Sequence, residues 1–172
     1  MKYFLSLGSN LGDKAQNLKK AVSLLREEGV KIIKVSSLYE TQPVEMPSQP
    51  WFFNQVIEVE MNHPPLPFLR LIKRVEKRMG RKRNYPRSPR IIDIDILLAQ
   101  GTVFRSDELT IPHPRMVSRN FVLIPFKEIS PAAVHPILKQ KIEHLCDVSP
   151  DRSKVIKIDP EIEKYHKKKH VQ

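Results

Sequence analysis

The chain has 172 residues, a length that fits one domain with a sizeable buried core. Its only cysteine, Cys146, excludes an intrachain disulfide framework and zinc-binding cysteine pairs, and favours a cytoplasmic location. Of the formal net charge of +11, residues 73–90 carry +8, from nine Lys or Arg and one Glu, so an anionic ligand is expected there.

The first third of the chain predicts a strand, a helix and two further strands. Residues 3–7 form a short apolar run that ends in a Gly-rich turn. Asp13, with Gln16 three positions later, favours the start of a helix over residues 14–28, and Gly29 ends it. The β-branched segments 30–39 and 51–61 predict strands, and the prolines between them predict an exposed loop over residues 40–50.

The middle of the chain completes a βαββαβ order. An apolar stripe predicts a helix over residues 67–80, and the apolar run 91–98 predicts a central strand. This order is the split βαβ of the ferredoxin-like class, an α+β sandwich with both helices on one face of the sheet. C-terminal additions follow, with edge strands at 109–111 and 154–158 and a short helix within 118–128. We expect one domain over residues 1–160 and a basic, disordered tail over residues 161–172.

Asp93 and Asp95 are the sharpest chemical signal in the sequence. Side chains two positions apart on a strand point to the same face, with their Cα atoms about 6.6 Å apart. Two carboxylates in an otherwise apolar strand repel each other unless a cation compensates them, and oxygen ligands suit magnesium that bridges phosphates. The alternative is a pair of carboxylates at a sheet end neutralised by nearby arginines.

A basic, proline-containing loop precedes this strand. Guanidinium groups bind phosphate oxygens bidentately and remain charged, so the loop could neutralise a triphosphate near the carboxylates. A basic run of this kind is also typical of a solvated or nucleic-acid-facing surface. The cations of the loop are Arg81, Lys82, Arg83, Arg87 and Arg90.

Two further groups of residues could complete a site. His113 lies between two prolines and near Arg115 and Arg119, where it could contact phosphate or be structural. The aromatic rings and the amide that a flat heterocycle would need could come from Phe52, Asn54 and Phe121, although strand-core residues are the simpler interpretation.

Other nucleotide-binding patterns are absent from the sequence. The glycines of residues 8–14 are too close together for a P-loop, and no G-x-G-x-x-G, kinase catalytic loop or H-E-x-x-H occurs. Nucleotidyltransferases join a Gly-Ser turn to a nearby acidic pair, whereas Gly8-Ser9 lies far from Asp93 in this chain. A ferredoxin-like RNA-binding module stays open as the alternative function, because residues 73–90 are strongly basic.

Five ordered motifs together resemble the 6-hydroxymethyl-7,8-dihydropterin pyrophosphokinase family of folate biosynthesis. The resemblance covers most of residues 1–129. The motifs are Leu7-Gly8-Ser9-Asn10-Leu11-Gly12-Asp13, Ser36-Ser37-Leu38-Tyr39-Glu40-Thr41, Asn54, Pro89-Arg90-Ile91-Ile92-Asp93-Ile94-Asp95-Ile96-Leu97 and Leu109-Thr110-Ile111-Pro112-His113-Pro114-Arg115-Met116.

The resemblance implies a ferredoxin-like enzyme that transfers pyrophosphate from ATP to the hydroxymethyl group of a reduced pterin and leaves AMP. It implies two Mg²⁺ ions held by Asp93 and Asp95, with these residues and Arg81 and Arg90 as the catalytic set. Neither nucleic acid nor membrane is an expected partner. ATP contacts are implied for Glu76, Arg81, Arg83, Arg87, Arg90, Ile96, Thr110, His113 and Arg119, and pterin contacts for Thr41, Val44, Phe52, Asn54 and Phe121. Many family members have an aromatic residue and a glycine where this chain has Arg87-Ser88.

Overall fold

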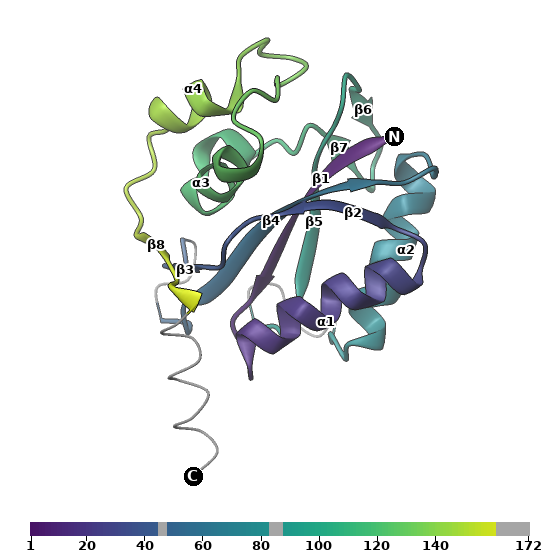
Figure 1. The fold of residues 1–172 in the computed structure, drawn as a ribbon, viewed down its shortest axis with the longest axis vertical. Coiled ribbons are helices and arrows are strands. Elements are labelled where there is room, and N and C mark those ends of the chain that lie inside the picture. Colours follow the sequence, from purple (N-terminus) through teal and green to yellow (C-terminus); the bar gives the residue numbers. More distant parts are fainter. Residues whose placement is uncertain (45–47, 83–87, 161–172) are drawn as a thin grey trace.

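The computed structural model describes residues 1–44, 48–82 and 88–160. Within them, a mixed α/β arrangement is built on one antiparallel sheet, with helices on both of its faces (Figure 1). The strand order is β5-β1-β4-β3-β8, and β2 also pairs with β4. The bounds are β1 Lys2–Ser9, β2 Lys31–Val35, β3 Tyr39–Thr41, β4 Phe52–Glu60, β5 Asp93–Ala99 and β8 Val155–Lys157.

Strand β1 is an interior strand of the sheet, antiparallel to β4 on one side and to the edge strand β5 on the other. It is apolar and buried over nearly its whole length, as expected for a strand that is covered on both faces. Strands that are distant in the chain are therefore brought together on either side of β1.

Helices α1 (Lys14–Glu27) and α2 (Pro65–Arg78) cover one face of the sheet (Figure 1). The Asp13 side chain caps α1 by accepting a hydrogen bond from the backbone N–H of Gln16 at 3.1 Å, which confirms the predicted helix start. Helix α2 begins at Pro65, so Pro67 lies in its first turn, as expected; proline is suited to a first turn because its missing N–H costs nothing there.

The opposite face is covered by α3 (Asn120–Ile129) and α4 (Ile142–Asp147). Each face has its own apolar cluster. On the α1/α2 side the rings of Tyr3 and Phe68 lie 4.6 Å apart, and on the α3 side those of Phe4 and Phe126 lie 4.5 Å apart, measured between centroids. The neighbouring positions 3 and 4 of β1 thus anchor both layers.

The structure differs from the sequence expectations at several places. Residues 30–39 are not one strand, because the chain passes from β2 to β3 at Ser36, whose hydroxyl bonds the backbone of Val56 and of Ser37. The predicted edge strand at 109–111 is β7 (Thr110–Ile111), which pairs with β6 (Phe104–Arg105) in a separate two-stranded sheet. Helix α4 was not predicted. A short 3₁₀ helix, Met116–Ser118, precedes α3.

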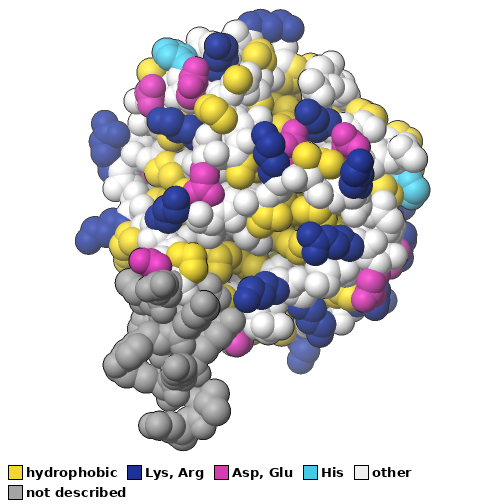
Figure 2. Space-filling view, viewed as in Figure 1, with side chains coloured by type: hydrophobic (Ala, Val, Ile, Leu, Met, Phe, Trp, Pro, Cys, Tyr) yellow, Lys and Arg dark blue, Asp and Glu magenta, His cyan; other side chains and the backbone are white. Residues whose placement is uncertain are grey.

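Charged side chains of both signs are interspersed on the surface of Figure 2. Within the described parts of the chain, no helix is long and apolar enough to cross a membrane. The predicted tail, residues 161–172, lies outside the described residues.

Candidate active site

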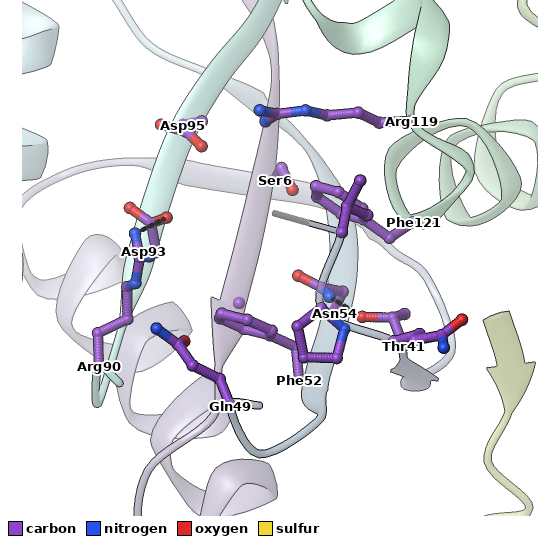
Figure 3. Close-up of a pocket in the computed structure, with 14 residues that line it drawn as sticks. Ser6, Thr41, Gln49, Phe52, Asn54, Arg90, Asp93, Asp95, Arg119 and Phe121 are labelled. Atoms are coloured by element: carbon purple, nitrogen blue, oxygen red, sulfur yellow. Dashed lines mark hydrogen bonds and ion pairs between the residues drawn. The ribbon is translucent and has the colours of Figure 1, made fainter. Parts of the chain in front are cut away.

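A pocket lies on the α3 face of the sheet, where β1, β4 and β5 run side by side (Figure 3). It draws its lining from the sheet, from the segment after β3 and from the start of α3. The lining residues are Ser6, Gly8, Thr41, Gln42, Pro43, Val44, Gln49, Phe52, Asn54, Arg90, Asp93, Asp95, Arg119 and Phe121.

Strand register explains why these side chains meet. Gly8 of β1 is directly opposite Asn54 of β4 and Asp93 of β5, and Ser6 is opposite Asp95. Residues directly opposite each other in an antiparallel sheet point to the same face. An amide from β4 and two carboxylates from β5 therefore lie on either side of a floor formed by the small residues of β1.

The floor at Gly8 has no room for a side chain. A Cβ atom at this position would lie 2.5 Å from Oδ1 of Asn54. The Asn54 amide is held in place because its Nδ2 donates a hydrogen bond to Oγ1 of Thr41 at 2.5 Å. Gly8 thus lets a buried amide lie against the backbone of β1.

Two phenyl rings flank this amide. Figure 3 shows the rings of Phe52 and Phe121 on either side of the Asn54 amide. The guanidinium of Arg90 lies 5.8 Å from the Phe52 ring centroid, and that of Arg119 lies 5.5 Å from the Phe121 ring centroid. This side of the pocket is suited to a flat, polar-edged molecule beside cationic groups.

Asp93 is held by two arginines. Nη1 of Arg81 lies 2.9 Å from Oδ1 of Asp93, and Nη1 of Arg90 lies 3.1 Å from Oδ2. Arg81 also pairs with the buried Glu76 of α2. Glu76 in turn accepts the backbone N–H of Ile94 at 3.2 Å, so α2 is tied to the outer edge of β5.

Asp95 lies two positions further along β5 than Asp93, opposite Ser6 of β1. Its burial, and then the negative charges of Asp93 and Glu76, raise the pKa of Asp95 to about 7. A cation near both carboxylates would offset this desolvation and repulsion. Among the described residues no group of three or more His, Cys, Asp or Glu could hold a metal. The carboxylate pair Asp93 and Asp95 suits Mg²⁺, which binds through one or two carboxylates plus substrate phosphates.

His113 lies beside β5, because its backbone N–H donates to the carbonyl of Leu97 at 2.7 Å. Burial, and then the positive charges of Arg119 and Arg115, lower the pKa of His113 to about 4, so the ring is neutral at physiological pH. Its Nδ1 accepts the N–H of Arg115 at 3.1 Å, which leaves the proton on Nε2. His113 can therefore offer an uncharged N–H donor to an anion.

The pocket brings together most of the residues expected from the sequence, but not all of them. It contains the five residues expected to contact a pterin and, from the expected ATP and metal sets, Arg90, Asp93, Asp95 and Arg119. Glu76, Arg81, Thr110 and His113 lie outside its lining, with Glu76 and Arg81 packed around Asp93. The Ile96 side chain is buried in the core facing α1 and α2, so only its main chain could reach a nucleotide. Arg83 and Arg87 lie outside the described residues.

Sequence reasoning assigned no site role to Asn10, which joins the two sides of the pocket. Its Oδ1 accepts the N–H of Arg90 at 2.8 Å, and its Nδ2 donates to Oε1 of Gln49 and to the carbonyl of Pro50. Ser6 and Gly8 were also missed. For Gly8 a signal existed, since a glycine inside a strand marks a close approach of another group.

Comparison with known proteins shows which family the chain matches. Residues 4–131 match the family described as 7,8-dihydro-6-hydroxymethylpterin-pyrophosphokinase (HPPK). The chain is 40% identical over 150 residues to the folic acid synthesis protein fol1 of Schizosaccharomyces pombe, covering 87% of this chain and 20% of that protein. It is 41% identical over 127 residues to the 2-amino-4-hydroxy-6-hydroxymethyldihydropteridine pyrophosphokinase of Bacillus subtilis, covering 73% of this chain and 76% of that protein.

A solved structure shares the fold. The Plasmodium falciparum HPPK-DHPS structure, wild type with STZ-DHP, superimposes with a TM-score of 0.67 at 19% identity, covering 85% of this chain and 42% of that one. The chain spans about a fifth of the length of the S. pombe protein, so that protein includes long regions without a counterpart here.

Proposed function

Because the chain belongs to the 7,8-dihydro-6-hydroxymethylpterin-pyrophosphokinase family, we propose that it transfers pyrophosphate from ATP to the hydroxymethyl group of 6-hydroxymethyl-7,8-dihydropterin and releases AMP. The observation that carries this proposal is the row Asp93–Gly8–Asn54 across β5, β1 and β4. It sets a carboxylate suited to a metal and an amide suited to a heterocycle one strand apart, in one pocket.

The ATP phosphates would lie over β5. Arg90 and Arg119 line the pocket there, and Arg81 reaches Asp93 from the end of α2. His113 can add a neutral N–H donor. Guanidinium groups that are already held by carboxylates bind a polyphosphate with little loss of side-chain freedom. We assign further ATP contacts to Glu76, Arg83, Arg87, Ile96 and Thr110 on the family resemblance.

Asp93 and Asp95 would hold two Mg²⁺ ions between them and the phosphates. When bound, these ions would neutralise the charge that develops on the phosphates during transfer. The raised pKa of Asp95 supports this assignment, because a nearby cation would stabilise the ionised carboxylate that burial and neighbouring negative charges disfavour.

The pterin would lie over β4. Its faces are apolar and would stack between the rings of Phe52 and Phe121, while its polar edge would bond the Asn54 amide. Thr41 holds that amide, and Val44 closes the apolar side of the pocket. A ring bound there directs its hydroxymethyl group across β1 toward the phosphates.

The reaction forms a bond between the hydroxymethyl oxygen and the β-phosphorus, while the bond from that phosphorus to the α–β bridging oxygen breaks. AMP leaves with this oxygen, and the hydroxyl proton passes to solvent. We assign no general base, because transfer of this kind depends mainly on positioning and charge neutralisation. Side chains on rigid strands supply the positioning.

We also infer that residues 1–160 form one domain of the ferredoxin-like class. The antiparallel order β5-β1-β4-β2, with α1 and α2 on one face, supports this inference. Helices α3 and α4 and strand β8 are then additions to that framework.

Product analysis tests the reaction. The purified chain, Mg²⁺, ATP and 6-hydroxymethyl-7,8-dihydropterin should yield AMP in proportion to the modified pterin. ADP formation instead would place the attack on the γ-phosphorus and overturn the proposal. Asp95→Ala should abolish turnover, by roughly a thousandfold or more, in a protein with unchanged circular dichroism. Asp107→Ala, which removes an exposed aspartate outside the pocket, is the matched control.

A further inference from the structure

The segment 149–158 lies beyond the residues matched by the family, 4–131, and touches two walls of the pocket. We name it the C-terminal strap. It leads from α4 to β8, and β8 lies along β3 (Figure 1). None of its residues lines the pocket, so its effect must pass through the residues that it holds.

The first anchor of the strap is Asp151, which fixes the start of α3. Its Oδ2 accepts the backbone N–H of Asn120 at 2.8 Å, and its carbonyl accepts Nδ2 of Asn120 at 3.0 Å. Its Oδ1 accepts both the N–H and the hydroxyl of Ser153. Asn120 lies between Arg119 and Phe121, so Asp151 holds the turn that carries both side chains into the pocket.

The second anchor lies at the opposite wall. The N–H of Gln42 donates to the carbonyl of Lys154 at 3.0 Å, and the N–H of Lys154 donates to Oε1 of Gln42 at 3.2 Å. Val155 then pairs with Thr41 in the β3–β8 ladder. Gln42 and Thr41 both line the pocket, and Thr41 holds the Asn54 amide.

Glu128 of α3 links helix α3 to β3 and to the strap. Its carboxylate accepts the N–H of Ser37 and the hydroxyl of Tyr39, and it lies 3.4 Å from Nζ of Lys157. The strap is therefore tied to the start of α3 through Asp151, to β3 through β8, and back to α3 through Lys157. Helix α3, the strap and β3 form a closed frame around one side of the pocket.

We propose that the C-terminal strap sets the spacing between the Phe121 wall and the Thr41 wall, and thereby the affinity for a flat heterocyclic acceptor. Asp151 and the β8 backbone are positioning elements, since they touch neither substrate. This proposal rests on the proposed function, because it assumes that the acceptor lies between these walls. The carboxylates of β5, Arg81 and Arg90 are outside the frame, and of the pocket arginines assigned to ATP only Arg119 is next to a strap anchor, so the strap should affect ATP less than the acceptor.

The variant Ile156→Pro tests whether the strap affects acceptor binding more than ATP binding. The N–H of Gln42 donates to the carbonyl of Lys154, and the N–H of Ile158 donates to the carbonyl of Leu38. In an antiparallel ladder every second residue pair is hydrogen-bonded, and Ile156, which pairs with Glu40, lies between these two bonded pairs. The N–H of Ile156 is therefore directed at β3, and proline removes it. The Ile156 side chain is 52% exposed, so little packing is lost. Ile156→Val keeps the backbone donor and is the matched control.

We expect Ile156→Pro to raise the Kd of 6-hydroxymethyl-7,8-dihydropterin and its KM roughly tenfold, the scale of one or two lost hydrogen bonds. The Kd of Mg-ATP should change less than about twofold, and kcat at saturating pterin should fall less than KM rises. Ile156→Val should match the wild type. Equal pterin affinity in the proline and valine variants, measured by calorimetry, would overturn the proposal.

Asp151→Ala tests the other anchor and keeps the proposal testable if Ile156→Pro does not fold. It should weaken pterin binding, and Asp151→Asn, which retains one acceptor for the Asn120 N–H, should restore part of the loss. Equal losses of pterin and ATP affinity in Asp151→Ala would contradict the proposed role. A wild-type protein that binds Mg-ATP but no pterin would instead refute the proposed function itself.

Discussion

At the scale of single residues, Gly8 shows how closely the floor of the pocket is filled. We predict that Gly8→Ala weakens pterin binding by roughly tenfold or more, the scale of inserting one methyl group into a packed site. The added Cβ would meet Oδ1 of Asn54 at 2.5 Å, and Thr41 keeps that amide from moving aside. Calorimetric titration of the pterin measures the change.

A double-mutant cycle tests whether the clash with Asn54 causes the loss of pterin affinity in Gly8→Ala. In an Asn54→Ala background the obstructing amide is absent, so Gly8→Ala should add little further loss of pterin affinity. Additive losses would show that the new methyl group acts on something other than Asn54.

Asp95 gives a pH-dependent prediction for stability without Mg²⁺. Its native pKa of about 7 lies above the ordinary value of 3.8, so its ionisation costs stability as pH rises from 4 to 7, and the full cost applies above 7. Asp95→Asn removes this cost. In EDTA the variant should melt higher than the wild type by a few degrees, about 2–4 °C for each kcal/mol recovered.

The gain in melting temperature should be larger at pH 8 than at pH 5, where the native wild type is already protonated at Asp95. Thermal denaturation at the two pH values measures it, and Asp107→Asn serves as an exposed control. A gain that is equal at both pH values would mean that charge at Asp95 is not its source.

The sequence predicted the residues of this site whose chemistry is unusual for their surroundings. Two aspartates in an apolar strand need an explanation whatever the fold, so Asp93 and Asp95 stood out. Asn10 did not, because an asparagine after a strand fits any turn, and its four hydrogen bonds to residues 49, 50 and 90 depend on tertiary structure. Ser6 gave no signal at all.

At the scale of elements, the tie between α2 and β5 depends on Glu76, which is 2% exposed. Glu76→Ala should lower the free energy of unfolding by about 1–3 kcal/mol, because the buried N–H of Ile94 loses its acceptor and Arg81 loses one of its two carboxylate partners. ATP turnover should fall with it, since Arg81 no longer faces Asp93 in one orientation.

Urea denaturation and the AMP assay measure the two effects. Glu76→Gln retains an acceptor for Ile94 and should recover more stability than activity. If the glutamine variant were fully active, the charge of Glu76 would have no part in directing Arg81.

Phe121 tests the division between β4 and β5 as separate halves of the site. Phe121→Ala should cost on the order of 1–3 kcal/mol of pterin binding, by analogy with base-on-aromatic stacking, and leave Mg-ATP affinity nearly unchanged. Calorimetry with both ligands checks this, with Phe104→Ala as an aromatic truncation outside the pocket. Loss of both affinities to the same degree would contradict the division.

Elements with a strong local pattern were predicted well, and those that depend on distant partners were not. Helix α1 follows from its cap and its apolar stripe. The break between β2 and β3 depends on a hydrogen bond from the Val56 N–H to the Ser36 hydroxyl, and Val56 is distant in the sequence. Helix α4 has only six residues, too few for a clear period.

At the scale of the whole molecule, the net charge of +11 is compatible with nucleic acid, but its arrangement and the family of the chain favour a small anion. Arg81 and Arg90 are paired with Asp93, and on the face of Figure 2 basic side chains alternate with acidic and apolar ones. An RNA-binding surface would present its cations unpaired and contiguous.

We therefore predict that added salt weakens the binding of Mg-ATP but not that of the pterin. Between 50 and 500 mM KCl the Kd of Mg-ATP should rise several-fold, since its phosphates contact cations, while that of the neutral pterin stays nearly constant. Filter binding should detect no tight RNA complex. Strong RNA binding with a steep salt slope, together with no AMP formation, would favour the RNA-binding alternative.

The position of β1 between β4 and β5 has a consequence for how the protein folds. Gly8 faces Asn54 on one side and Asp93 on the other, and both partners are far away in the sequence. Such contacts have high contact order, so forming them requires closing long stretches of chain. The candidate site cannot exist in a partly folded chain, because both of its halves need β1 as their floor. Ligand-binding capacity should therefore disappear at the same urea concentration as the sheet itself, in one cooperative transition.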